Sequence, residues 1–250
     1  MHRCFLEERV PDSATITICG DEANHIIKVL RYKVGDEFEI CDNSGYVYVA
    51  SVMKIEGKTL TAEIKSKYIS NNEPSIKVIA FQGLSKGTKM ELVIQKCVEL
   101  GVSEIVPVQM EYSVVKFKED GLKSERWQRV ATEAAKQCKR AIVPTVKKPV
   151  AFSEAIKMMK SLDLALLPYE CEREGSLKKF LKSNLTAESI GYIVGPEGGF
   201  SNDEIQLADR EKIYKVTLGN RILRTETASF TMLSVIMYEL GELDKKTGEV

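Results

Sequence analysis

Residues 192–201 read Tyr-Ile-Val-Gly-Pro-Glu-Gly-Gly-Phe-Ser, an apolar run that ends in a glycine-rich loop. This combination is typical of a buried strand in a parallel sheet, where ligands bind at the carboxyl ends of the strands. Glycine lets the backbone approach a ligand closely, and proline fixes one turn of the loop. Ser201, with Glu204 three residues later, is a capping-box signal and predicts a helix directly after the loop.

The glycines of this loop leave two interpretations open, a tight turn without a ligand or a ligand-binding loop. The loop is not a nucleotide-binding Walker loop, because no Gly-Lys-Ser/Thr follows it. It also lacks the G-x-G-x-x-G pattern of dinucleotide-binding proteins.

A second loop lies at residues 218–228, which read Leu-Gly-Asn-Arg-Ile-Leu-Arg-Thr-Glu-Thr-Ala. It follows a predicted strand and leads into a largely apolar helix. Charges beside so apolar a helix are unfavourable unless they pair with each other or meet a ligand. Two hypotheses therefore remain at this point: Arg221, Arg224 and Glu226 form a structural network that caps the helix, or they belong to a ligand site.

Around these loops, short apolar runs alternate with amphipathic segments. This alternation predicts an α/β domain with a mostly parallel sheet and helices on both faces. The predicted strands are Ile76–Phe81, Glu104–Val108, Asp163–Leu167, Ile190–Val194 and Ile213–Leu218, and the predicted helices are Lys89–Leu100, Lys123–Ala141, Phe152–Lys160, Asp203–Arg210 and Thr227–Leu240.

The first part of the chain has a different pattern. Predicted strands at Glu37–Cys41, Tyr46–Ile55 and Thr59–Tyr68 are separated by short turns with asparagine and glycine, which is typical of a small antiparallel barrel. One helix, Asp21–Arg31, interrupts them, with Ala23, Ile26, Ile27 and Leu30 facing inward. A polar stretch at residues 70–74 separates two predicted domains, residues 1–72 and 73–250.

Composition excludes several classes of protein. Lysine plus arginine and aspartate plus glutamate number 36 each, so any RNA-binding surface must be a local patch. No apolar run has the length of a membrane helix, and no signal peptide is evident, so we expect a cytoplasmic protein without membrane contact. The six cysteines form no C-x-x-C pair and there are only two histidines, so we expect no metal site.

Taken together, G-P-E-G-G-F-S-x-x-E at 195–204 and L-G-x-R-I-L-R-T-E-T-A at 218–228 resemble the SPOUT superfamily of RNA methyltransferases. More narrowly, they resemble the bacterial family that methylates N3 of a uridine in 16S ribosomal RNA. The resemblance covers nearly the whole chain and includes Asn24-His25-Ile26 and the segment 133–140. The sequence departs from the family at Lys139, where glycine is more common, and at Asn220, where proline is common.

This resemblance implies a deep trefoil knot in the C-terminal domain, a PUA-like N-terminal barrel, a homodimer, and S-adenosylmethionine (SAM) as cofactor. It also implies that three loops at strand ends hold SAM. The cofactor-binding residues expected from it are Leu166, Leu167, Pro168, Val194, Gly195, Pro196, Glu197, Gly198, Gly199, Leu218, Gly219, Ile222, Leu223, Arg224 and Thr227.

The chemistry requires that uracil N3 lose a proton before it accepts a methyl group. An arginine can stabilise the resulting charge and a carboxylate can take the proton, so Arg224 and Glu226 are the catalytic candidates, unless both only shape the loop. Asn24, Lys28 and Arg31 share one face of the predicted helix at Asp21–Arg31. With them, the expected RNA-binding residues are Arg3, Arg9, Lys86, Lys89, Gln137 and Arg140.

Other functions remain open from the sequence. A catalytically silent PUA-like RNA-binding or ribosome-assembly factor would use the same N-terminal domain, and a SPOUT methyltransferase acting on another RNA would have a different one. A nicotinamide-dependent oxidoreductase would require the missing glycine fingerprint.

Overall fold

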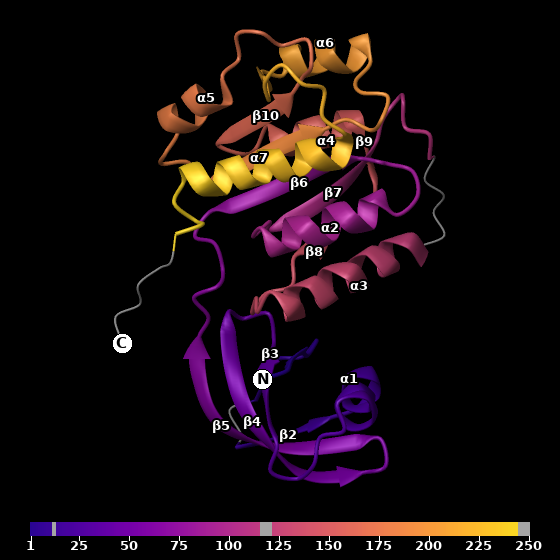
Figure 1. Ribbon diagram of the computed structural model, residues 1–250, viewed down its shortest axis with the longest axis vertical. Coiled ribbons are helices and arrows are strands. Elements are labelled where there is room, and N and C mark those ends of the chain that lie inside the picture. Colours follow the sequence, from indigo (N-terminus) through magenta and orange to yellow (C-terminus); the bar gives the residue numbers. More distant parts are fainter. Residues whose placement is uncertain (12–13, 116–121, 245–250) are drawn as a thin grey trace. The chain divides into compact units, whose positions relative to one another are not determined.

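The computed structural model describes residues 1–11, 14–115 and 122–244 (Figure 1). The chain divides into two compact units. The N-terminal unit consists of Met1–Glu73 together with Ala135–Val143, and the C-terminal unit consists of Pro74–Ala134 together with Pro144–Val250. A short segment from the middle of the chain thus belongs to the N-terminal unit.

The N-terminal unit contains a five-stranded sheet in the order β1-β3-β4-β5-β2. All neighbouring strands run antiparallel except β1 and β3, which are parallel. The predicted antiparallel strands are therefore confirmed and form one sheet, with one parallel pair added, and the closure of this sheet into a barrel stays a prediction. Gly45 and Gly57 occupy its predicted turns with φ of 85° and 60°. The strands are β1 (Arg3–Phe5), β2 (Thr15–Ile18), β3 (Glu37–Cys41), β4 (Tyr46–Glu56) and β5 (Thr59–Ile69).

The prediction of one α-helix over Asp21–Arg31 is wrong. The structure has a short helix, α1 (Gly20–Asn24), followed by a π-helical turn, η1 (His25–Val29). A π-helix has more residues per turn than an α-helix, so α-helical spacing no longer predicts which side chains share a face. Arg31 lies beyond the helix with φ of 56°, a left-handed conformation that is uncommon for a residue with a side chain.

The apolar side of this segment is nevertheless as predicted. Ala23 and Ile26 are fully buried, and Ile27 and Leu30 pack partly against the same core. That core lies under the sheet and includes Phe38, Ile40 and Leu60.

Ion pairs and hydrogen bonds attach the segment Ala135–Val143 to the rest of the N-terminal unit. Glu73 accepts hydrogen bonds from Arg140 at 2.8 Å and from the backbone of Ala141 at 2.7 Å. Arg3 donates to Glu39 at 3.0 Å and also to the carbonyl of Lys139. Lys139 has φ of 63°, a left-handed conformation that glycine adopts more readily than lysine.

The C-terminal unit contains a seven-stranded sheet in which every paired strand is parallel. Its order is β12-β10-β11-β6-β7-β8, with β9 also paired to β7. The strands are β6 (Lys77–Gly83), β7 (Glu104–Gln109), β8 (Thr145–Val146), β9 (Val150–Ala151), β10 (Leu164–Pro168), β11 (Ser189–Val194) and β12 (Tyr214–Val216).

Helices cover both faces of this sheet, which confirms the predicted architecture. On one face, α4 and α6 pack against strand residues such as Phe81 and Ile193. On the other face, α2 and α7 lie side by side and α7 contacts β6 and β11 (Figure 1). The knot of the C-terminal domain stays a prediction. The helices are α2 (Lys89–Glu99), α3 (Leu122–Gln137), α4 (Phe152–Met159), α5 (Leu177–Ser183), α6 (Asn202–Arg210) and α7 (Thr225–Glu239).

Candidate functional site

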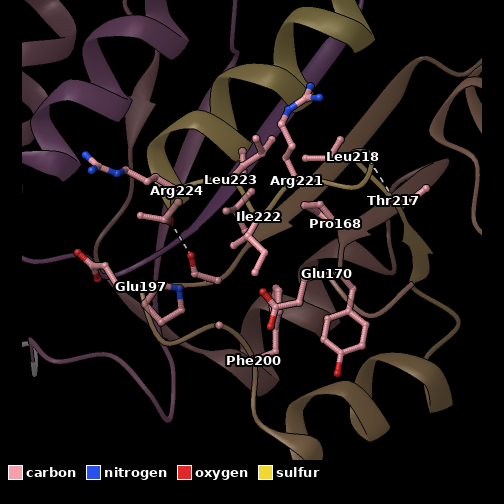
Figure 2. Close-up of a pocket in the computed structure, with 18 of the residues that line it drawn as sticks. Pro168, Glu170, Glu197, Phe200, Thr217, Leu218, Arg221, Ile222, Leu223 and Arg224 are labelled. Carbon is pink, nitrogen blue, oxygen red and sulfur yellow. Dashed lines mark hydrogen bonds between the residues drawn. The ribbon is translucent and has the colours of Figure 1, made fainter. Parts of the chain in front are cut away.

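A pocket of about 340 Å³ lies where β10, β11 and β12 end. These three strands are neighbours in the sheet, so the loops that follow them meet at one edge (Figure 2). The pocket is lined by Lys89, Pro168, Tyr169, Glu170, Val194, Gly195, Pro196, Glu197, Gly199, Phe200, Thr217, Leu218, Gly219, Arg221, Ile222, Leu223, Arg224, Thr225 and Ala228.

The glycine-rich loop after β11 packs tightly against neighbouring segments. A Cβ atom on Gly83 would lie 2.5 Å from the backbone nitrogen of Pro196, and one on Gly198 would lie 2.7 Å from the Cβ of Tyr112. Gly199 has φ of 73°, which residues with side chains rarely adopt. Glycine at these positions therefore lets neighbouring segments pack against the loop.

The predicted capping box at the start of α6 is present. The Ser201 side chain accepts a hydrogen bond from the backbone of Glu204, and the Glu204 side chain accepts one from the backbone of Ser201. Glu204 also accepts a hydrogen bond from the backbone of Glu111 at 2.9 Å. The capping box therefore fixes the end of the glycine-rich loop and the segment after β7 at the same time.

A chain of two hydrogen bonds joins three segments behind the pocket. The Gln82 amide donates to Thr225 Oγ1 at 2.8 Å, and that hydroxyl donates to the Gly195 carbonyl at 2.6 Å (Figure 2 marks the second bond). Gln82 is fully buried at the end of β6, and Thr225 is buried at the start of α7. Since the Gln82 amide also donates to the Gly83 carbonyl at 3.2 Å, only its nitrogen fits this position.

We expect Thr225→Val to lower the free energy of unfolding by about 1–3 kcal/mol. The substitution keeps the size of the side chain but leaves the buried Gln82 amide and Gly195 carbonyl without this partner. Thr225→Ser keeps the hydroxyl and should lose much less. Urea unfolding followed by circular dichroism measures both, and equal stability of the Val and Ser variants would contradict the role of the hydroxyl.

Glu197 is held at the pocket by the loop that precedes α2. Its carboxylate accepts hydrogen bonds from the Lys89 side chain at 2.9 Å and from the Lys86 backbone at 3.2 Å. Partial burial raises the pKa of Glu197, but the hydrogen bonds and the Lys89 charge outweigh burial and lower this pKa below its usual value. The negative charge of Glu197 is therefore already neutralised by Lys89.

Arg221 and Arg224 of the second loop, unlike Lys89, have exposed side chains. Arg224 is the N-cap residue of α7, and its exposed side chain extends away from the pocket floor (Figure 2). Arg221 also lines the pocket and is exposed. Glu226 lies in the first turn of α7 and is not among the lining residues. Its Oε2 atom is buried and has no hydrogen-bond partner within the described part of the chain.

The structure brings most of the predicted cofactor-binding residues to the pocket, but not all of them. Leu166 and Leu167 are fully buried in β10, Thr227 is exposed on α7, and Gly198 packs against Tyr112. Several residues that line the pocket were not among the predicted cofactor-binding residues. Phe200, Arg221, Thr225 and Ala228 lie within the two motifs, and Thr217 comes directly before the second. Tyr169 and Glu170 belong to the loop after β10, which has no motif.

The residues predicted to bind RNA lie in three kinds of surroundings. Arg3 and Arg140 are buried and bonded inside the N-terminal unit, and Asn24 is half-buried. Lys89 is paired with Glu197, and Lys86 is exposed beside it. The remaining predicted residues, all of them exposed, are Arg9, Lys28, Arg31 and Gln137, and Arg9 lies 3.7 Å from Asp42.

Among residues 1–11, 14–115 and 122–244, no three His, Cys, Asp or Glu side chains form a group that could hold a metal ion. In the same residues, no helix combines the length and apolar character needed to cross a bilayer.

Comparisons with known proteins match both parts of the chain. A family model described as an RNA methyltransferase domain matches residues 71–237, and one described as an RNA methyltransferase PUA domain matches residues 18–65. The chain is 33% identical over 248 residues to ribosomal RNA small subunit methyltransferase E of Bacillus subtilis, covering 96% of this chain and 97% of that protein. It is 34% identical over 225 residues to the protein of the same name in Synechocystis sp., covering 89% and 73%.

A solved structure is similar over the same length. The crystal structure of a ribosomal RNA small subunit methyltransferase E from Neisseria gonorrhoeae, bound to S-adenosyl methionine, matches with a TM-score of 0.87 and 30% identity. The match covers 95% of this chain and 97% of that chain.

Proposed function

Since the chain belongs to the RNA methyltransferase family that includes the ribosomal RNA small subunit methyltransferases E, we propose that it methylates N3 of a uridine in 16S ribosomal RNA. The methyl donor is SAM. The single observation that carries this proposal is the pocket at the ends of β10, β11 and β12, which both sequence motifs line. A silent RNA-binding factor would have no need of such a pocket.

The residues of the pocket fit SAM. Its volume of about 340 Å³ lies within the range of small-molecule sites. Ile222 is 83% exposed although it is apolar, so a flat ring that covers it would remove apolar surface from water. With Leu218 and Leu223 it would contact adenine, and the backbone of Gly195 and Gly199 would lie close to the edges of the ligand.

SAM supplies an activated methyl group, so the protein has to bind it, orient it and stabilise the reacting uracil. Arg224 stabilises the negative charge that spreads over O2 and O4 when N3 loses its proton. Glu226 is the candidate acceptor of that proton. Its unpartnered Oε2 leaves one acceptor available, although the side chain is not among those that line the pocket.

RNA binding is assigned to the predicted N-terminal domain, residues 1–72, and to exposed basic residues near the pocket. We expect the double variant Lys28→Ala/Arg31→Ala to bind RNA more weakly and with a lower salt dependence. The slope of log K against log salt should fall by about one unit for each phosphate that the variant no longer neutralises. Both side chains are exposed, and Arg31 is presented in a left-handed conformation. Filter binding at several salt concentrations measures the slope.

The affinity of this double variant for SAM should stay unchanged, because neither residue lines the pocket. Lys33→Ala is a matched control, since Lys33 is exposed and follows Arg31 closely in the chain. Normal RNA affinity and salt slope in the double variant would remove this segment from the RNA-binding surface.

The enzyme acts as a homodimer, formed through the C-terminal domain. Closed two-fold dimers are the commonest oligomers, and Tyr238 and Leu243 near the end of α7 are 71% and 51% exposed. We expect light scattering to give twice the chain mass of 28.0 kDa. An active species of 28.0 kDa at assay concentration would contradict the dimer. The compartment is the reducing cytoplasm, in keeping with the free thiols of the chain.

The proposed function is tested by methyl transfer from labelled SAM to purified small ribosomal subunits. Nucleoside mass analysis of the product should find 3-methyluridine in 16S ribosomal RNA. Transfer to another nucleoside or to another RNA would assign the chain a different substrate. Binding of RNA without any transfer would favour an assembly factor.

A further inference from the structure

One carboxylate of the pocket has no partner among the described residues. Lys89 and Glu197 neutralise each other at 2.9 Å. Glu170 also lines the pocket, yet no hydrogen bond or ion pair joins its carboxylate to any other described residue. It is therefore the pocket carboxylate that can match a positive charge on a ligand.

Glu170 is exposed and follows Tyr169, a residue that the backbone and an aromatic contact fix in place. Its neighbour Tyr169 donates a backbone hydrogen bond to the Val216 carbonyl at 3.0 Å, which attaches the end of β10 to β12. The Tyr169 ring meets the edge of Phe200 with ring centres 6.4 Å apart. Figure 2 shows the Glu170 carboxylate directed toward the space between Phe200 and Ile222. Because Glu170 is exposed, solvent screens part of its electrostatic effect on a ligand.

The Glu170 carboxylate offsets part of the positive charge of the pocket. The lining residues Lys89, Arg221 and Arg224 are cationic, and Glu170 and Glu197 are anionic. Without Glu170, the pocket would present a larger excess of positive charge to whatever it binds. Such an excess disfavours a cationic ligand far more than a neutral one.

SAM and its product differ in charge at one atom. When the methyl group leaves, the electrons of its bond to sulfur stay on sulfur, and the sulfonium becomes the neutral thioether of S-adenosylhomocysteine (SAH). The amino and carboxyl groups are the same in both molecules. A carboxylate that acts on the sulfonium therefore distinguishes the two, whereas one that binds the ammonium favours both equally.

We propose that Glu170 is a specificity-determining residue that favours cationic SAM over neutral SAH through the sulfonium charge. This inference rests on the proposed function of the pocket. It gives the site a way to bind the substrate and release the spent product, because the attraction disappears with the methyl group.

Titration calorimetry of the full-length protein with SAM and with SAH tests the proposal. We expect Glu170→Gln to weaken SAM binding about tenfold, as one charge at about 6 Å would in a partly screened site, and to change SAH binding by less than about twofold. Glu174→Gln is the matched control, because Glu174 is an exposed carboxylate of the same loop that does not line the pocket. Neither Kd should change in that variant.

Two results would overturn the assignment: an unchanged SAM affinity in Glu170→Gln, or equal losses for SAM and SAH. A cationic analogue with a protonated amine in place of the sulfonium should follow SAM, and an analogue that follows SAH would also count against it. Failure of the proposed function is distinguishable, because the wild-type protein would then bind neither SAM nor SAH.

Discussion

Arg224→Ala is expected to lower turnover by about a hundredfold or more when both SAM and RNA are saturating. In other enzymes, removal of a positioned group that stabilises charge in the transition state lowers turnover by a similar factor. Arg224 is suited to that role because it lies at the rim of the pocket, and its exposed side chain forms no ion pair with another described residue. The measurement is kcat from methyl transfer to small subunits.

Arg221→Ala is the matched control for this experiment, since Arg221 is an exposed arginine of the same loop that also lines the pocket. If Arg221 serves only binding, its loss should raise KM and leave kcat nearly unchanged. Arg224→Lys should recover part of the lost turnover, because it restores the charge without the geometry of the guanidinium. Full turnover in Arg224→Ala would remove Arg224 from the chemistry.

Gly83→Ala is expected to weaken SAM binding at least tenfold, or about 1.4 kcal/mol. The added Cβ would lie 2.5 Å from the backbone nitrogen of Pro196 and 2.8 Å from the carbonyl carbon of Gly195. These are backbone atoms of the loop that lines the pocket, so the whole turn must shift. Overpacking of this kind also lowers the free energy of unfolding by about 1–3 kcal/mol. Calorimetry and urea unfolding measure the two effects.

Gly87→Ala is the control that distinguishes the steric clash at Gly83 from the general effect of replacing a glycine. Gly87 has φ of 69°, but a Cβ there would meet no atom of the described residues within 4 Å. Its replacement should therefore strain the backbone and lower stability while leaving SAM affinity unchanged. If Gly83→Ala binds SAM as the wild type does, the loop has more freedom than its contacts indicate.

The alternation of apolar and polar residues was sufficient to predict the long elements of the fold. The predicted strand Glu37–Cys41 agrees with β3, and the helix predicted at Lys89–Leu100 ends one residue later than α2. The short strands β8 and β9 were missed because two residues carry no periodicity. The π-helical turn was missed because its apolar residues fit an α-helix as well.

The parts of the site that lie in a sequence motif were predictable. The parts that depend on contacts between distant segments were not. The loops at 195–201 and 218–228 line the pocket, as their glycines and charges indicated. Gln82 is a polar residue at the end of an otherwise largely apolar strand, a signal that was available but has many possible causes. Arg140 looked like an RNA contact because of its charge, and only the fold places it, buried, against Glu73.

The strand order of the sheet also determines when the pocket exists during synthesis of the protein. The pocket needs β10, β11 and β12, which span residues 164–216, and the start of α7 at Thr225. A ribosome adds roughly 5–20 residues per second, so β6 and β7 are made seconds before the strands that complete the sheet. The nascent chain therefore cannot gain stability from SAM until the segment through Thr225 has emerged. Chains that end before β12 would expose an unpaired sheet edge, which can pair with other chains and aggregate.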